Sequence, residues 1–370
     1  MSNPRPPLVD VIAGARPNFM KIAPILRAMQ QRQLAGSALR YRLVHTGQHY
    51  DDRMSGDFFV QLGIPAPDVN LGVGSGTQAE QTANIMMGYE KLLLDARSDL
   101  CLVVGDVTST MACAIAAQKL RVPVAHVEAG IRSGDWSMPE EINRLVTDSI
   151  TNWFFTTSEV ANRNLRAAGA RAEQIHFVGN TMIDTLLANL DRLRVPTFWD
   201  QAGLLPGGYF VMTLHRPANV DDSRGFSRLL TAVGAAVRGL PVVFPVHPRT
   251  AKTMAQLPDR PAGLLVVDPQ PYLEFNYLVR HAKGVITDSG GVTEETTVLG
   301  VPCITLRDTT ERPETVTMGT NELIGTDPAA LKPTLDKLFA GQWKQGTIPP
   351  LWDGRTGQRI ADVLDRLLCG

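Results

Sequence analysis

The chain has 370 residues, more than one hydrophobic core usually supports, so we expect two domains. Its 36 Lys and Arg residues nearly balance its 37 Asp and Glu residues, which argues against nucleic acid or an anionic membrane as the main partner. The N-terminal segment has prolines where a signal peptide would be apolar, and no stretch approaches the ~18 apolar residues of a membrane span, so a cytoplasmic location is expected.

Cysteine and histidine spacing gives no indication of a disulfide framework or a zinc site. The four cysteines show neither CxxC spacing nor clustering with histidine, and they are typical of small buried residues in a reducing compartment. His126 and Glu128 share a strand face, but no third ligand follows at a suitable spacing. We therefore predict no bound metal.

Short apolar runs alternate with longer amphipathic stretches along the chain. In the first half they predict strands over Leu8–Ala13, Tyr41–Thr46, Leu100–Gly105, Val122–Val127 and Trp153–Thr157. In the second half they predict strands over Tyr209–Leu214, Pro241–Val246, Gly263–Val267, Gly284–Thr287 and Val301–Leu306. Helical periodicity covers Gln78–Leu94, Met111–Leu120, Val160–Ala168, Met182–Leu193, Phe226–Val237 and Gly357–Leu368. Strands this apolar are buried on both faces, so we predict an α/β fold of two Rossmann-like domains that join near Val178–Trp199.

Residues that directly follow the predicted strands are candidates for a site, because open parallel sheets bind ligands beyond the carboxyl ends of their strands. In the first half these residues are Arg16, Lys21, Asp106 and Glu128. In the second half they are His215, His247 and the segment Asp288–Glu295. Two sheets that face each other with these edges would form a cleft between the domains.

Several of these residues also have a structural explanation. Asp106 could cap the following helix, and His215 could be a structural histidine at a strand end. Glu140 and Arg144 lie four apart on a predicted helix, where an exposed ion pair is common.

The strongest local signal is the segment Asp288–Glu295, which follows a predicted strand and opens a helix. Its glycines let the backbone approach a ligand closely, and the free amides of a helix start favour phosphate. Glu294 or Glu295 could then accept hydrogen bonds from ribose hydroxyls. The absence of Walker A and GxGxxG sequences argues against ATP hydrolysis and dinucleotide redox chemistry. The segment predicts a nucleotide diphosphate site, with a ligand-free tight turn as the alternative.

Seven motifs in order, from about residue 10 to about residue 325, resemble the non-hydrolysing UDP-N-acetylglucosamine 2-epimerase family. They are GARPNFMKIAPI, TGQHYD, VVGDVTST, HVEAGIRSGD, PEEINR, TLHRPANVDD and TDSGGVTEE…RDTTERPE. The resemblance implies two Rossmann-like domains of the GT-B (glycogen-phosphorylase/glycosyltransferase-like) fold, with the active site in the interdomain cleft. It also implies a C-terminal helix that returns to the N-terminal domain. The expected domains are therefore residues 1–180 plus 355–370, on the sugar side, and residues 181–354, which bind UDP.

The resemblance further implies an isomerase that needs no external cofactor. A base removes the C2 proton of UDP-N-acetylglucosamine while UDP leaves C1, which gives 2-acetamidoglucal. UDP then adds back with protonation of the opposite face, which gives UDP-N-acetylmannosamine. Asp106, Glu128 and Glu140 match the acidic catalytic positions of the family, and any two could divide the roles of base and acid. His215 matches the catalytic histidine.

The candidate substrate-binding residues are Arg16, Lys21, Gln48, His49, Arg144, His247, Phe275, Ser289, Gly290, Gly291, Glu295 and Arg312. Arg16, Lys21 and His215 would stabilise the pyrophosphate as negative charge builds on it. The turn that starts at Ser289 would contact the phosphates, Glu295 the ribose and Phe275 the uracil. Arg144 would bind phosphate or orient Glu140, and Arg312 would face the sugar or the diphosphate.

One departure from the family pattern argues against allosteric activation by substrate. Tyr50-Asp51 follows Gln48-His49 where a glutamine is expected, and Gly74-Ser75-Gly76 occupies the loop that carries an arginine. A hydrolysing 2-epimerase, or a 2-epimerase of a modified UDP-hexosamine such as a diacetamido-uronic acid derivative, stays an alternative. A glycosyltransferase would need an acceptor site, and a non-catalytic UDP-sugar-binding module would have little use for the three carboxylates. The resemblance also implies a homodimer.

Overall fold

The computed structural model describes the chain except for residues 1–4, 48–60, 247, 256 and 258–260, and it gives only the backbone of residues 16, 17, 217, 218, 248 and 249. The chain forms two compact units. The N-terminal unit is Met1–Ala188 with Pro350–Gly370, and the C-terminal unit is Asn189–Pro349. The sequence-based division at residues 180/181 and 354/355 stays a prediction. Among the described residues, no helix is long and apolar enough to cross a membrane.

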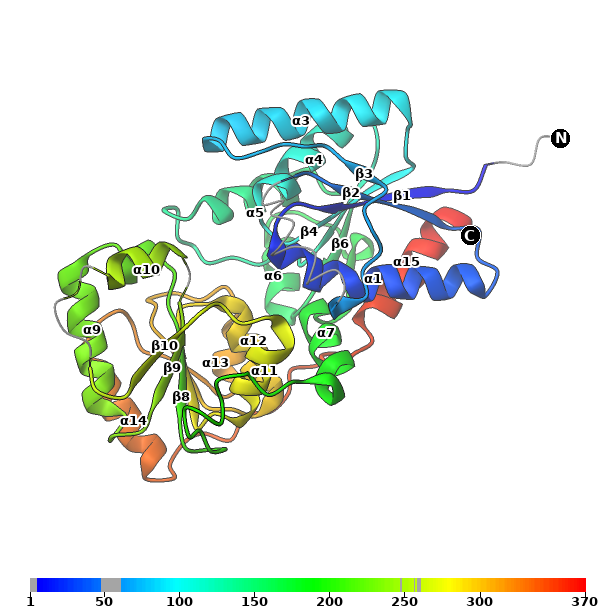
Figure 1. The fold of residues 1–370 in the computed structure, drawn as a ribbon. Coiled ribbons are helices and arrows are strands. Elements are labelled where there is room, and N and C mark those ends of the chain that lie inside the picture. Colours follow the sequence, from blue (N-terminus) through cyan, green and yellow to red (C-terminus); the bar gives the residue numbers. More distant parts are fainter. Residues whose placement is uncertain (1–4, 48–60, 247, 256, 258–260) are drawn as a thin grey trace. The chain divides into compact units, whose positions relative to one another are not determined.

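Within its described residues the N-terminal unit holds a seven-stranded parallel sheet of order β3-β2-β1-β4-β5-β6-β7 (Figure 1). The strands are β1 (Leu8–Ala13), β2 (Arg40–His45), β3 (Val69–Asn70), β4 (Leu100–Val104), β5 (Val124–Val127), β6 (Trp153–Thr156) and β7 (Ile175–Phe177). The helices are α1 (Arg16–Leu34), α3 (Gln78–Asp95), α4 (Thr108–Lys119), α5 (Pro139–Ser149), α6 (Glu159–Ala167), η1 (Ala172–Gln174), α7 (Thr181–Asn189) and α15 (Thr356–Cys369).

The described part of the C-terminal unit holds a six-stranded parallel sheet of order β10-β9-β8-β11-β12-β13. The strands are β8 (Phe210–Thr213), β9 (Val242–Pro245), β10 (Leu264–Val267), β11 (Gly284–Thr287), β12 (Cys303–Thr305) and β13 (Asn321–Leu323). The helices are η2 (Leu190–Arg192), α8 (Pro217–Val220), α9 (Ser223–Ala236), α10 (Pro248–Met254), α11 (Tyr272–His281), α12 (Gly290–Leu299), α13 (Pro313–Thr317), η3 (Pro328–Ala330) and α14 (Leu331–Phe339).

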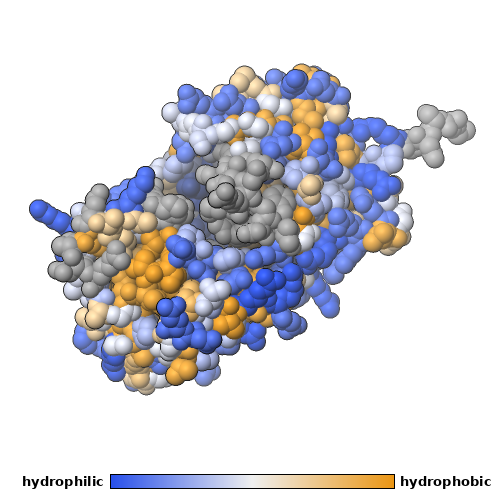
Figure 2. Space-filling model, viewed as in Figure 1, coloured by the Kyte–Doolittle hydropathy of each residue, from blue (hydrophilic) through white to orange (hydrophobic). Residues whose placement is uncertain are grey.

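Both sheets are parallel and covered by helices, so the predicted α/β class with two Rossmann-like units is confirmed. Every residue of β4 and β11 is buried, which is why both strands are continuous apolar runs. In the N-terminal unit α3 and α4 cover one face of the sheet, and α1 and α15 cover the other (Figure 1). Hydrophilic residues cover much of the face seen in Figure 2, between smaller hydrophobic areas.

Both sheets reverse their strand order at one point, and this point is where such sheets bind ligands. In the N-terminal unit it lies between β1 and β4, and in the C-terminal unit between β8 and β11. Asp106 and Glu128 follow β4 and its neighbour β5, and His215 and Asp288 follow β8 and β11. The topology therefore brings these predicted residues of each unit to one edge of its sheet.

Helix α15 packs against α1 through a close backbone approach at Gly357. A Cβ added at Gly357 would lie 2.4 Å from the Pro24 carbonyl oxygen, and the Gly357 amide donates to Asp184 Oδ2 at 2.7 Å. Arg32 on α1 also pairs with Asp362 and Asp365 on α15. These contacts join the C-terminal helix to the N-terminal unit.

We expect Gly357→Ala to destabilise the protein by about 1–3 kcal/mol, because its methyl group would push α15 away from α1. An alanine inside a helix ordinarily stabilises it, so the opposite sign identifies the close approach as the cause. Denaturant unfolding of both proteins measures the difference. Gly74→Ala is the control, because a Cβ there meets nothing within 4 Å. Equal stabilities for Gly357→Ala and Gly74→Ala would contradict the packing.

Candidate active site

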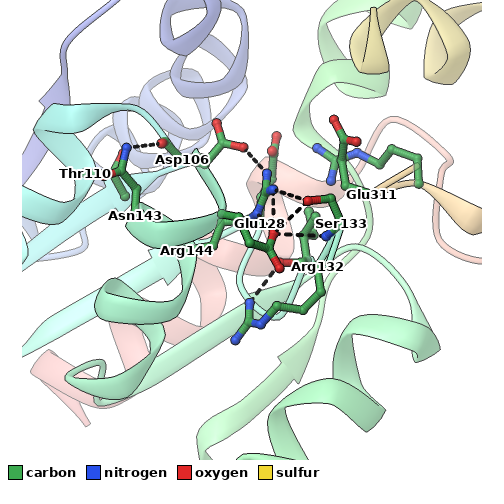
Figure 3. Close-up of polar contacts among 12 residues, drawn as sticks. Asp106, Thr110, Glu128, Arg132, Ser133, Asn143, Arg144 and Glu311 are labelled. Atoms are coloured by element: carbon green, nitrogen blue, oxygen red, sulfur yellow. Dashed lines mark hydrogen bonds and ion pairs between the residues drawn. The ribbon is translucent and has the colours of Figure 1, made fainter. Parts of the chain in front are cut away.

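Asp106 directly follows β4 and is held by α5. Arg144 Nη1 lies 2.5 Å from Asp106 Oδ2, and Asn143 Nδ2 donates to the Asp106 carbonyl oxygen at 2.8 Å (Figure 3). The residue that caps α4 is Val107, with no side-chain hydrogen bond. The alternative explanation of Asp106 as a helix cap is therefore wrong, and its carboxylate stays partly exposed at the edge of the sheet.

Arg144 pairs with Glu141 and not with Glu140. Its guanidinium, which is almost fully buried, donates to Glu141 Oε2 at 2.6 and 3.0 Å and to Ser133 Oγ at 3.2 Å. The alternative explanation of Glu140 and Arg144 as an ion pair is wrong, because α5 turns Glu141 inward, where it also accepts from the amides of Ser133 and Gly134. Burial raises the pKa of Glu141, but these amides and Arg144 together lower it below its usual value.

Glu128 lies at the end of β5 in an unusual backbone conformation. Its φ is +67°, a left-handed value that a residue with a side chain seldom adopts. The amides of Glu128 and Ala129 both donate to the Phe155 carbonyl oxygen, at 3.0 and 3.2 Å, which holds this turn against β6. The Glu128 side chain is buried, and Lys21 Nζ of α1 lies 2.7 Å from its Oε2. Glu128 and Lys21 thus form a mostly buried ion pair. It joins α1 to the end of β5, which lies two strands away from β1 in the sheet.

His215, at the end of β8, is held by a buried carboxylate that sequence reasoning did not assign a role. Its Nδ1 lies 2.7 Å from Asp288 Oδ1, and about half of the His215 side chain is exposed. Asp288 is fully buried and also accepts from the amide of Arg216 and from Asn219 Nδ2, at 2.9 and 3.0 Å. Burial raises the pKa of Asp288, but His215 and these donors lower it below its usual value. Asp288 therefore orients the ring, with Nε2 directed away from the pair.

The turn that follows Asp288 opens helix α12. Ser289 is the N-cap residue of α12, and its side chain makes no capping hydrogen bond. Gly290 and Gly291, which begin the first turn of the helix, are both half-exposed. A Cβ added at Gly290 would lie 2.9 Å from Glu311 Oε1. Glu311 pairs with Arg307 at 2.6 Å, and although burial raises its pKa, Arg307 lowers it to about 2. An anionic side chain thus lies beside the glycine turn, which no sequence pattern indicated.

Glu295 lies one turn further along α12 and is almost fully buried. It accepts from Tyr272 Oη at 3.0 Å and from Asn276 Nδ2 at 3.4 Å. Phe275, on the same helix as these two donors, is half-buried and packs against the core of the unit. Arg312 is buried and pairs with Glu294. Contacts of these residues with ribose, uracil or sugar stay predictions.

Burial raises the pKa of Glu295 to about 7, although its two donors oppose the shift. The folded protein therefore favours the protonated acid, and this contribution to stability is complete below pH 4.5 and lost as the pH rises to about 7. We expect Glu295→Gln, which cannot ionise, to raise the melting temperature at pH 8 and to leave it nearly unchanged at pH 4.5.

Calorimetry of both proteins at the two pH values tests this expectation. Glu322→Gln is the matched control, because that side chain is half-exposed and pairs only loosely with Lys344, at 3.5 Å. The same difference at both pH values for Glu295→Gln would contradict the raised pKa.

The structure does not describe the side chains of four predicted site residues. Gln48, His49 and His247 lie outside the described residues, and Arg16 is described only by its backbone, which begins α1. Glu140 is half-exposed in the first turn of α5. Its catalytic role stays a prediction.

Two parallel α/β sheets, each with polar side chains gathered near the point where its strand order reverses, place this chain among proteins built from two Rossmann-like units. Residues 32–365 match the family model described as UDP-N-acetylglucosamine 2-epimerase. The chain is 38% identical to the UDP-N-acetylglucosamine 2-epimerase of Methanocaldococcus jannaschii, over 96% of this chain and 98% of that one. The chain therefore belongs to the UDP-N-acetylglucosamine 2-epimerase family.

One further relative and one solved structure are similar to this chain over nearly all of its length. The chain is 41% identical to the UDP-2,3-diacetamido-2,3-dideoxy-D-glucuronate 2-epimerase of Pseudomonas aeruginosa, over 96% of this chain and 99% of that one. The crystal structure of the M. jannaschii UDP-GlcNAc 2-epimerase in complex with UDP-GlcNAc and UDP matches with a TM-score of 0.86 and 37% identity. That match covers 97% of this chain and 99% of the other.

Proposed function

We propose that this chain is a non-hydrolysing 2-epimerase that interconverts UDP-N-acetylglucosamine and UDP-N-acetylmannosamine. The observation that carries the proposal is the pair of carboxylates, Asp106 and Glu128, at the carboxyl ends of the neighbouring strands β4 and β5. Each carboxylate contacts a cation: Asp106 contacts Arg144, which Glu141 shares, and Glu128 contacts Lys21. Inversion at C2 removes a proton from one face of the sugar and returns one to the other, so it needs two such groups.

The reaction proceeds by elimination and re-addition. One carboxylate takes the C2 proton, the C2–H electron pair forms the C1–C2 double bond, and the C1–O bond breaks with release of UDP. UDP then attacks C1 of the 2-acetamidoglucal while a second acid protonates C2 on the opposite face. Asp106, Glu128 and Glu140 are the candidates, and any two of them can supply the base and the acid.

The C-terminal unit holds UDP in this proposal. The first turn of α12 offers backbone amides and the positive end of the helix dipole to the diphosphate. His215, oriented by Asp288, presents Nε2 to the leaving phosphate and stabilises its growing charge.

One observation supports a different UDP-sugar as the alternative substrate. The relative that acts on UDP-2,3-diacetamido-2,3-dideoxy-D-glucuronate is 41% identical to this chain, against 38% for the M. jannaschii UDP-N-acetylglucosamine 2-epimerase. A C3 acetamido group and a C6 carboxylate distinguish this sugar, while the reaction at C2 stays the same.

The kcat/KM ratio for the two UDP-sugars tests the substrate assignment. We expect the higher value with UDP-N-acetylglucosamine, and a higher value with the uronate would assign the second substrate instead. Phosphorus NMR of the same reactions follows the pyrophosphate. Intact UDP-sugar is expected at equilibrium, whereas accumulation of free UDP would show a hydrolysing enzyme.

The family resemblance also supports a homodimer, as most soluble oligomers are symmetric assemblies of one chain. Sedimentation equilibrium at micromolar concentration is expected to give twice the mass of the chain. A single species of monomer mass would contradict this part of the proposal.

A further inference from the structure

His126 is a buried histidine of β5 that the proposed reaction does not use. Its ring is fully buried, and both nitrogens are hydrogen-bonded: Nδ1 lies 2.7 Å from Asp148 Oδ1, and Nε2 lies 2.8 Å from the Gly105 carbonyl oxygen. Gly105 directly precedes Asp106, so the ring contacts the backbone that carries one candidate catalytic carboxylate.

Both nitrogens of this ring face acceptors. A carbonyl oxygen can only accept, so Nε2 carries a proton. Burial raises the pKa of Asp148, but His126 and Arg132 lower it below its usual value. Hydrogen bonds at both ring nitrogens therefore tie Gly105 to Asp148 of α5.

Asp148 extends this connection to the second carboxylate. Its Oδ2 accepts from the Gly130 amide at 3.0 Å and from Arg132 Nη1 at 2.6 Å. Gly130 lies two residues after Glu128. From its other side Gly130 is confined by α6, because a Cβ there would lie 2.5 Å from the Ala161 carbonyl oxygen. The Asp106 and Glu128 turns are thus both hydrogen-bonded to the His126–Asp148 pair.

We propose that His126 and Asp148 are positioning residues that fix the carboxylates of Asp106 and Glu128 relative to each other. This inference rests on the proposed function, because it matters only if these carboxylates exchange protons with one substrate. A buried histidine–carboxylate pair contributes little to stability compared with apolar side chains of the same volume, so stability alone does not explain this pair. Two proton transfers on opposite faces of one carbon do require fixed geometry, since a displacement of about 1 Å can cost roughly 100-fold in rate.

The test compares variants that break the hydrogen bonds of His126 to Gly105 and Asp148 with a variant that keeps them. His126→Phe fills the space without hydrogen bonds, and His126→Gln keeps only one of the two. Asp148→Asn keeps both, because its amide N–H can donate to Nδ1 of a neutral ring while its oxygen accepts from Gly130. Nε2–H of that ring still donates to Gly105.

We expect kcat to fall at least ~100-fold for His126→Phe and about 10-fold for His126→Gln, with KM and the Kd for UDP within about 3-fold of the unaltered protein. Asp148→Asn should keep kcat within about 10-fold of the unaltered protein and clearly above that of His126→Phe. If His126→Phe does not fold, His126→Gln carries the same comparison.

Asp10→Asn is the matched control for loss of a buried charge. Asp10 is fully buried in β1 and pairs with Arg42 at 2.7 Å, and it lies in register with Cys101 at the other end of β4. A lower melting temperature with unchanged kcat is expected for it.

Unchanged kcat in both His126 variants would overturn the inference, as would an equal loss in Asp10→Asn or in Asp148→Asn. These results leave the proposed function intact, because the unaltered protein still turns over. No turnover by the unaltered protein with any UDP-hexosamine would instead overturn the proposed function and the inference with it.

Discussion

Asp106→Asn is expected to lower turnover at least ~100-fold and to leave UDP binding nearly unchanged, the effect of losing an acid–base group. The amide has the shape of the carboxylate and can still accept from Arg144, which donates to Asp106 Oδ2 at 2.5 Å. It cannot take or return a proton. Because UDP is proposed to bind the C-terminal unit, its Kd measured by calorimetry should change little while kcat falls.

Asp99→Asn is the matched control for this prediction. Asp99 lies just before β4 and Asp106 just after it, and the two side chains are similarly exposed, 34% and 30%. Asp99 pairs with Arg5 and accepts from the Leu8 amide at the opposite end of the strand. The control should turn over normally. Wild-type turnover by Asp106→Asn would remove Asp106 from the mechanism.

Asp288→Asn has the second large expected effect, a loss of at least ~100-fold in kcat. The carboxylate accepts from Nδ1 of His215 at 2.7 Å and holds the ring with Nε2 directed away from Asp288. An asparagine can present its NH₂ group to the ring, which permits the wrong tautomer and removes the charge that stabilises an imidazolium. His215→Ala should lower kcat by a similar factor, and the double variant by little more, because the two residues act as a unit.

Asp222→Asn controls for the loss of a carboxylate that holds backbone amides. Asp222 caps α9 by accepting from the amides of Arg224 and Gly225, at 3.1 and 3.0 Å, and asparagine caps a helix equally well. It should behave like the unaltered protein. Additive losses in the Asp288→Asn, His215→Ala double variant would show that the two residues act separately.

Strands that form apolar runs of four or more residues could be predicted, and the shorter edge strands β3 and β7 could not. The apolar runs at Leu8–Ala13 and Gly284–Thr287 coincide with β1 and β11. Strands β3 and β7 have two and three residues, and no residue of either is buried. A segment that short forms no apolar run, and its pairing with a neighbour is decided by the rest of the sheet.

The strand-end rule located Asp106, Glu128 and His215, because it needs only the order of strands and the residues after them. The partners of these residues come from elements distant in sequence: Asp288 for His215, and Arg144 for Asp106. Arg144 reaches Asp106 from helix α5, and Asp288 meets His215 because β11 pairs with β8. Both contacts depend on how elements distant in sequence are brought together.

Whether Arg144 pairs with Glu140 or with Glu141 depends on which face of α5 is buried. Spacings of three and four residues both place side chains together, so the sequence allowed either glutamate. The fold decides for Glu141, because α5 buries that side of the helix against the Ser133 turn. Glu140, one residue earlier, faces another direction and stays half-exposed.

The central claim is that the protein breaks and remakes the C2–H bond of a UDP-N-acetylhexosamine without losing UDP. Its most direct test is incubation with UDP-N-acetylglucosamine in D₂O, followed by proton and phosphorus NMR. We predict UDP-N-acetylmannosamine with deuterium at C2 and an intact pyrophosphate. Epimer that retains the original proton at C2, or no exchange and no epimer with any UDP-hexosamine tried, would contradict the account.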